Sequence, residues 1–66
     1  MLPKEVFVTL VLERTTYPSR QVRQRVLDPP DKITAGAMAA DALSDWLHGG
    51  WRVARVVSIE GMEDAD

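Results

Sequence analysis

The residues best suited to chemistry in this 66-residue chain are arginines, which occur early as Arg14, Arg20, Arg23 and Arg25 and late as Arg52 and Arg55. A guanidinium group donates paired hydrogen bonds to a carboxylate or a phosphate, so these residues suit the recognition of anions. Arg23 and Arg25 are two positions apart and share one face of any strand that contains them. The alternative, which stays open, is that they only keep an exposed sheet face in contact with water.

The residue types that usually carry catalysis do not form a recognisable motif. His48 is the only histidine, and we expect it at a helix end, where its cationic form interacts favourably with the last carbonyl groups. Asp41 and Asp45 lie one helical turn apart, which is too few ligands for a metal ion. No serine belongs to a nucleophile motif, and no glycine pattern resembles a phosphate-binding loop. We therefore expect no catalytic residue, no cofactor and no metal site.

Three segments have the patterns of β-strands. Residues 5–13 are apolar on both faces, which predicts a central strand. Residues 20–27 alternate Val22 and Val26 with Arg23 and Arg25, which predicts a half-exposed strand in a hairpin with the first. Residues 51–59 place Trp51, Val53, Val57 and Ile59 in one phase. Arg55 interrupts that phase, so we expect it near a sheet edge, on the face covered by the helix.

Between the second and third strands the apolar spacing becomes helical, from Lys32 to His48. Asp31 is a suitable N-cap, and Gly49 and Gly50 end the helix. The side expected to be buried consists of Ala35, Ala39, Leu43, Trp46 and Leu47. We also expect Trp46 and Trp51 both to pack near the C-terminal end of this helix.

These elements predict an α+β fold of order β-β-α-β. If the third strand lay beside the second, the helix would form a parallel crossover; beside the first, it completes an antiparallel sheet. The two-sided apolar pattern of residues 5–13 favours the second arrangement. We therefore predict a three-stranded antiparallel sheet, order 2-1-3, with one helix packed on one face. Residues 1–60 form the domain, and residues 61–66 form a flexible acidic tail.

The uncovered face of this sheet is the candidate site. Apolar side chains rimmed by arginines are typical of a protein interface. The candidate partner-binding residues are Arg55, Arg52, Arg23, Arg25, Phe7, Val11 and Val56, with Ala54 beside them. Two alternatives stay open: the tail or the hairpin loop covers this face, or the chain forms a homodimer through this face or an edge strand.

Charge and composition restrict the partner and the location. The net charge of −2 argues against general binding of nucleic acid, although residues 1–27 carry five basic and two acidic side chains. The chain has no cysteine. The apolar run at residues 6–12 is too short to span a membrane, and no secretion signal precedes it. These features predict a cytoplasmic protein without a membrane partner.

The segment from Asp45 to Val56 resembles the end of a small bacteriophage protein that inhibits its host's RNA polymerase. The matching residues are Trp46, Gly50, Trp51, Val53, Arg55 and Val56. The resemblance implies the same strand–strand–helix–strand order and a polymerase-contacting role for Arg55. The second arginine of that family is replaced here by Val57. In its small size and its lack of a recognisable motif, the chain is also similar to anti-CRISPR proteins.

Both resemblances imply a non-enzymatic, phage-encoded inhibitor in the bacterial host cytoplasm, which blocks a host RNA polymerase or a CRISPR effector by protein–protein contact. The alternative function is a homodimeric nucleic-acid-binding module that uses Arg20, Arg23, Arg25 and Arg52. For Arg55, the structural alternative is an internal ion pair with Glu5 or Glu13.

Overall fold

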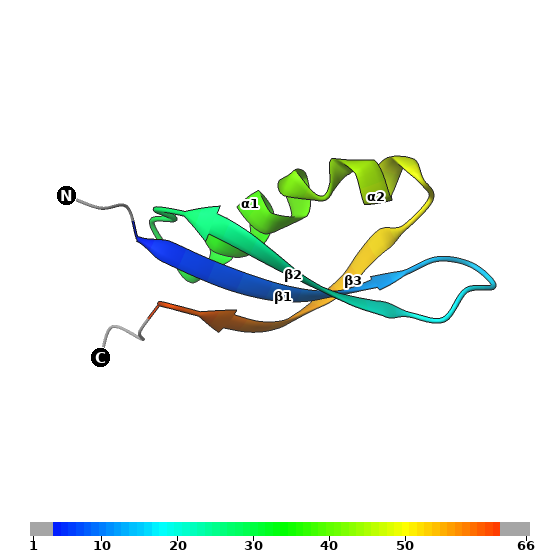
Figure 1. Cartoon of the computed structure of the whole chain (residues 1–66), viewed down its shortest axis with the longest axis horizontal. Coiled ribbons are helices and arrows are strands. Elements are labelled where there is room, and N and C mark those ends of the chain that lie inside the picture. Colours follow the sequence, from blue (N-terminus) through cyan, green and yellow to red (C-terminus); the bar gives the residue numbers. More distant parts are fainter. Residues whose placement is uncertain (1–3, 63–66) are drawn as a thin grey trace.

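The sheet is organised around one long central strand. In the computed structural model, which describes residues 4–62, β1 (Glu5–Glu13) pairs with β2 (Arg20–Leu27) on one side and with β3 (Arg52–Glu60) on the other. Both pairings are antiparallel, and the strand order is β2-β1-β3. Two helices, α1 (Lys32–Ala42) and α2 (Ser44–His48), lie on one face of the sheet (Figure 1). The predicted α+β fold and strand order are confirmed.

The core lies between β1 and α1. Side chains at alternate positions of β1 have no exposed surface because the helices cover them, namely Val6, Val8, Leu10 and Leu12. On α1 the corresponding residues are Ala35 and Ala39, which are also completely buried. Because alanine is short, the helix axis can lie close to the sheet. We call this side of the sheet the covered face and the opposite side the open face.

Local signals fix both ends of the helical segment. The carboxylate of Asp31 accepts a hydrogen bond from the backbone N–H of Thr34 at 2.6 Å, so the predicted N-cap is confirmed. At the other end Gly50 has φ of +92°, a backbone conformation that favours glycine. The chain can therefore reverse directly from α2 into β3.

The helix predicted over residues 32–48 is not continuous. Leu43 leaves the helical region (φ −96°, ψ 25°), and its N–H bonds to the carbonyl of Ala40, so the chain bends between α1 and α2. After the bend Trp46 packs edge-on against Trp51, with ring centroids 5.6 Å apart. The prediction that both tryptophans pack near the end of the helical segment is confirmed. Leu47 remains 38% exposed, so its predicted burial is wrong.

β3 departs from strict alternation at two β-bulges. Thr9 pairs with Ser58 but Leu10 pairs with Val56, which leaves Val57 as an extra residue. In the same way Ala54 is extra between the pairs Val11–Arg55 and Leu12–Val53. Each extra residue reverses the alternation of the residues beyond it.

The bulges correct two predictions about faces. Arg55 lies opposite Val11 on the open face, so its predicted place on the covered face beside Val53 and Val57 is wrong. Val56 lies opposite Leu10 on the covered face, and a Cβ atom added at Gly36 of α1 would be 3.6 Å from its Cγ2. Its predicted place on the open face is therefore wrong.

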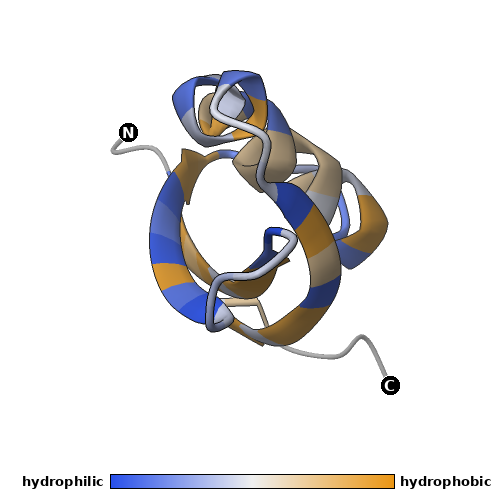
Figure 2. Ribbon diagram, turned by 90° about the vertical axis from the view of Figure 1, so that its right-hand side faces the viewer, coloured by the Kyte–Doolittle hydropathy of each residue, from blue (hydrophilic) through white to orange (hydrophobic). Residues whose placement is uncertain are grey.

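The strongly twisted sheet gives an elongated molecule of about 43 × 22 × 14 Å (Figure 2). Beyond β3, Met62 packs against the core. The remainder of the predicted tail, residues 63–66, lies outside the described residues. Among residues 4–62 no helix has the length and apolar character needed to cross a membrane.

Candidate partner-binding surface

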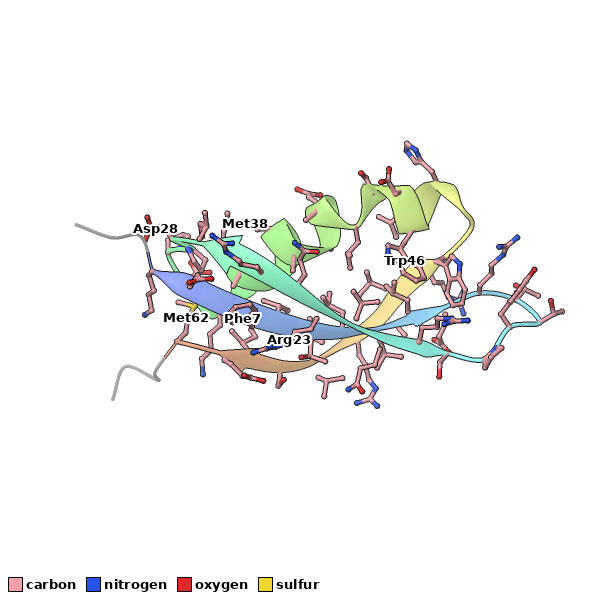
Figure 3. All side chains as sticks on the ribbon, viewed as in Figure 1. Phe7, Arg23, Asp28, Met38, Trp46 and Met62 are labelled. Carbon is pink, nitrogen blue, oxygen red and sulfur yellow. The ribbon has the colours of Figure 1, made fainter. Side chains whose placement is uncertain are left out.

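The open face gathers most of the predicted site residues. Since paired residues of an antiparallel sheet share a face, the register places six of them there: Phe7, Val11, Arg23, Arg25, Arg52 and Arg55. Figure 3 shows Phe7 and Arg23 on the side of β1 turned away from the helices. The hairpin loop projects beyond the end of the sheet and does not fold over this face (Figure 1). The predicted set is thus a continuous surface apart from Val56.

Half of this surface is occupied by internal contacts. Nε of Arg25 lies 3.0 Å from Oε1 of Glu5, and Nη2 of Arg23 lies 3.2 Å from Oε2 of Glu60. Arg23 reaches Glu60 by crossing Phe7, with its Cζ 4.1 Å from the ring centroid. We call these five residues the paired half of the open face.

The ion pairs of the paired half neutralise charge without adding much stability. All four charged side chains are more than half exposed, and water screens such pairs effectively. The cation–π contact covers part of Phe7, whose side chain is only partly accessible. Arg23 and Arg25 are therefore attached loosely and present little uncompensated positive charge.

The other half contains Val11, Arg52 and Arg55, and we call it the unpaired half. Arg55 lies opposite Val11, and Arg52 lies opposite Glu13. Both arginines are exposed, and neither forms an ion pair with any residue from 4 to 62. The internal pairing considered for Arg55 is not observed, since Glu5 pairs with Arg25 instead. The unpaired half thus presents two guanidinium groups beside a half-buried apolar residue, with the carboxylate of Glu13 as a neighbour of Arg52.

The set of arginines considered for nucleic-acid binding does not share one face. Arg20 lies opposite Leu12, so it belongs to the covered side of the sheet. Arg23 and Arg25 are compensated by glutamates, which leaves Arg52 as the one member on the open face without an ion pair among the described residues. A continuous positive stripe is therefore absent from residues 4–62.

An aromatic cluster at the end of the sheet was not anticipated as a site. Trp46, Gly49 and Trp51 line a shallow hollow of about 240 Å³ with Arg14 and Asp45. Arg14 also stacks over Tyr17, with its Cζ 4.5 Å from the ring centroid. The sequence signal for this cluster is the pair of tryptophans on either side of Gly49 and Gly50, which by itself indicates only packing.

Groups with catalytic potential remain scattered. His48 is exposed at the end of α2, and Asp41 lies on the exposed side of α1. Within residues 4–62 no three histidine, aspartate or glutamate side chains gather as metal ligands. Backbone and side-chain hydrogen bonds from Thr34 lower the pKa of Asp31, which reflects its capping role.

The comparisons with known proteins leave the site to be interpreted from its own geometry. The surface described above combines two exposed arginines with an apolar neighbour on one face of the sheet. No family model, no curated protein and no solved structure matches this chain.

Proposed function

We propose that this chain is a non-enzymatic binding protein whose unpaired half, Val11, Arg52 and Arg55, contacts an acidic surface of another protein. The observation that carries this proposal is the contrast in arginine pairing. Arg23 and Arg25 have glutamate partners, whereas Arg52 and Arg55 have none among residues 4–62. Exposed guanidinium groups without an internal partner can donate paired hydrogen bonds to the carboxylates of another protein.

The chemistry of this surface favours protein over nucleic acid as the partner. Val11 lies on the central strand opposite Arg55 and supplies apolar area beside the arginines. Polar groups around an apolar centre are typical of protein interfaces. The net charge of −2 opposes close approach of a polyphosphate chain. An acidic patch on a protein needs only a local positive surface, which the unpaired half provides.

The narrower proposal is a phage-encoded inhibitor that blocks a bacterial RNA polymerase or a CRISPR effector in the host cytoplasm. Its support is the resemblance carried by Trp46, Gly50, Trp51, Val53, Arg55 and Val56. In that family the residue corresponding to Arg55 contacts the polymerase, and exposure of Arg55 on the open face is compatible with such a contact.

The test is capture from a bacterial lysate with wild-type protein and matched variants. Arg55→Glu reverses a charge of the unpaired half, whereas Arg20→Glu reverses an exposed charge on the other side of the sheet. We expect mass spectrometry to identify a polymerase or CRISPR effector subunit with wild type and Arg20→Glu, and its loss with Arg55→Glu. Equal recovery by all three proteins would exclude the unpaired half as the binding surface. Capture of metabolic enzymes alone would refute the proposal that the target is a polymerase or a CRISPR effector.

Arg55→Ala then gives the quantitative measurement with the purified partner. Loss of a desolvated charge pair should weaken binding by about 2–5 kcal/mol. The melting temperature should hardly change, because Arg55 makes no ion pair within the described residues. A lower melting temperature with unchanged affinity would instead show a structural role. A titration with random duplex DNA at increasing salt tests the nucleic-acid alternative, and binding at physiological salt would support it.

A further inference from the structure

The two outer strands present different edges to solvent. β2 pairs with β1 without interruption from Arg20 to Leu27, so its backbone follows a regular strand. β3 contains bulges at Ala54 and Val57, which bend an edge and disrupt its row of hydrogen-bonding groups. Of the two edges, β2 therefore has the geometry that can accept another strand.

The direction of the β2 backbone groups follows from two hydrogen bonds. The N–H of Asp28 donates to the carbonyl of Lys4 at 2.8 Å, so residue 28 points toward β1. Direction alternates along an antiparallel strand, and the outward N–H and C=O groups are therefore those of Gln21, Arg23, Arg25 and Leu27. In agreement, the carbonyl of Arg25 accepts its hydrogen bond from the side chain of Gln24 at 3.1 Å.

Around the middle of this edge the side chains are basic on the open face and mainly apolar on the covered face. Arg23 and Arg25 lie on the open face, and β2 has no acidic residue. On the covered face the strand contributes Val22 and Val26, with Gln24 between them. Met38 of α1 is 38% exposed, and because it is two residues from Gly36 it projects from nearly the opposite side of the helix. Since Gly36 faces Val56 of β3, that opposite flank is the one toward β2.

A second copy of the chain fits this edge poorly. Antiparallel self-pairing centred on β2 puts Arg23 opposite Arg23, or Arg23 opposite Arg25, of the other molecule. Like charges directly opposite each other destabilise a strand pair. A strand with carboxylates at alternate positions has the complementary pattern.

From these observations we infer that the β2 edge accepts, as a fourth strand, an extended segment of another protein in which acidic and apolar residues alternate. Its backbone pairs with the outward groups of Arg23 and Arg25, where it replaces the Gln24 side-chain amide as the donor to the carbonyl of Arg25. Its carboxylates face the two guanidinium groups. The apolar side chains lie beside Val22, Val26 and Met38. Glu5 and Glu60 do not prevent this, because exposed ion pairs rearrange at little cost and each guanidinium has further donors. The inference concerns a different surface from the unpaired half and does not depend on it.

The probe is a fluorescent peptide as long as β2, eight residues, that alternates glutamate and valine. A peptide of the same composition with consecutive glutamates is its control. We expect the alternating peptide to bind at least about tenfold more tightly in anisotropy titrations. Amide exchange at Arg23 and Arg25 should slow in its presence, since their N–H groups become hydrogen-bonded. Equal affinity for both peptides, or unchanged exchange at these two amides, would overturn the inference.

Variants separate the edge from the unpaired half. Arg25→Glu should lower the affinity for the alternating peptide about tenfold or more, whereas Arg55→Glu should leave this affinity unchanged. A chemically synthesised chain with a methyl group on the backbone nitrogen of Arg25 keeps the charge but loses the outward donor, and it should also bind weakly. If Arg55→Glu lowers the peptide affinity as much as Arg25→Glu does, the peptide lies across the open face and not along the β2 edge, and the edge proposal is wrong. Sedimentation that shows a stable dimer through β2 would also refute it.

Discussion

On the covered face of β1 the even-numbered residues are completely buried, whereas on the open face the residues between them keep part of their surface in solvent. The covered face is held by close packing against Ala35 and Ala39 of α1. The open face carries exposed ion pairs, which add little stability, and one arginine that lies across Phe7. One strand therefore carries a side that stabilises the fold and a side whose charged groups can exchange partners.

The same difference between the faces supports the proposal that the open face binds a partner. Changes to the covered face alter a closely packed layer and cost stability. Changes to exposed charges have small effects on stability, so such positions can be devoted to recognition. The following predictions test this division, in order of decreasing effect.

The largest effect is expected for Leu43→Ala on the covered side. Leu43 is 4% exposed, and its truncation should lower the free energy of unfolding by about 2–5 kcal/mol. For a domain of this size that loss approaches the total stability. Leu47→Ala is the matched control, because Leu47 is 38% exposed and its loss should cost less than about 1 kcal/mol. Urea unfolding of both variants measures the difference, and equal costs would mean that the bend at Leu43 is misplaced.

Two glycine substitutions should act in opposite directions. Gly61 has φ of +102°, and a Cβ atom there would be 2.6 Å from the carbonyl oxygen of Glu5, so Gly61→Ala should cost about 1–3 kcal/mol. Gly36 lies inside α1 with ordinary contact distance to Val56. Gly36→Ala should therefore stabilise the domain by about 0.5–1 kcal/mol. Thermal melts of both variants test this, and a destabilising Gly36→Ala would indicate closer packing of α1 on β3 than the structure shows.

Asp31 should make the anchoring of α1 depend on pH. Its pKa is lowered in the folded state by hydrogen bonds from Thr34, so its contribution to stability is present above the unfolded-state pKa. That contribution is lost as the pH falls through the folded-state pKa. Asp31→Asn keeps a capping side chain without a titrating group. The melting temperatures of wild type and Asp31→Asn should therefore converge in acid, and a constant difference at all pH values would contradict the role of the charge.

The smallest effect is expected in the paired half of the open face. A double-mutant cycle of Arg23→Ala and Glu60→Gln should give a coupling free energy of about 0.2–1 kcal/mol. Because both side chains are more than half exposed, the coupling should fall further at high salt. A coupling free energy as large as the loss of stability in Leu43→Ala would contradict this division, because the open face would then stabilise the fold as much as the covered face does.

Much of the architecture was predictable because local and global signals agree. The two-sided apolar pattern of β1 required a strand on each side, which determined the order of the sheet. Asp31 and Gly50 marked the ends of the helical segment through capping chemistry and a positive φ. Such features depend on a few neighbouring residues, and their sequence patterns are specific.

The errors came from features with no local signal. Nothing in the sequence around Leu43 marks a bend, and the apolar spacing continues through it to Leu47. The bend precedes α2, which carries Trp46 to its contact with Trp51 on the other side of the turn at Gly50. That contact is made in the folded structure and has no local sequence signal. Likewise, the paired state of Arg23 depends on Glu60, which lies far away in sequence.

The sequence by itself determined the element types, the central position of β1 and the presence of several arginines on one side of the sheet. The tertiary structure decided which arginines are compensated and which face Arg55 occupies. The physical reason lies in the register of β3 with β1: two extra residues, Ala54 and Val57, are accommodated as bulges. A strand pattern has a period of two, so an inserted residue exchanges the two faces, and only pairing with a partner strand reveals where the insertion falls.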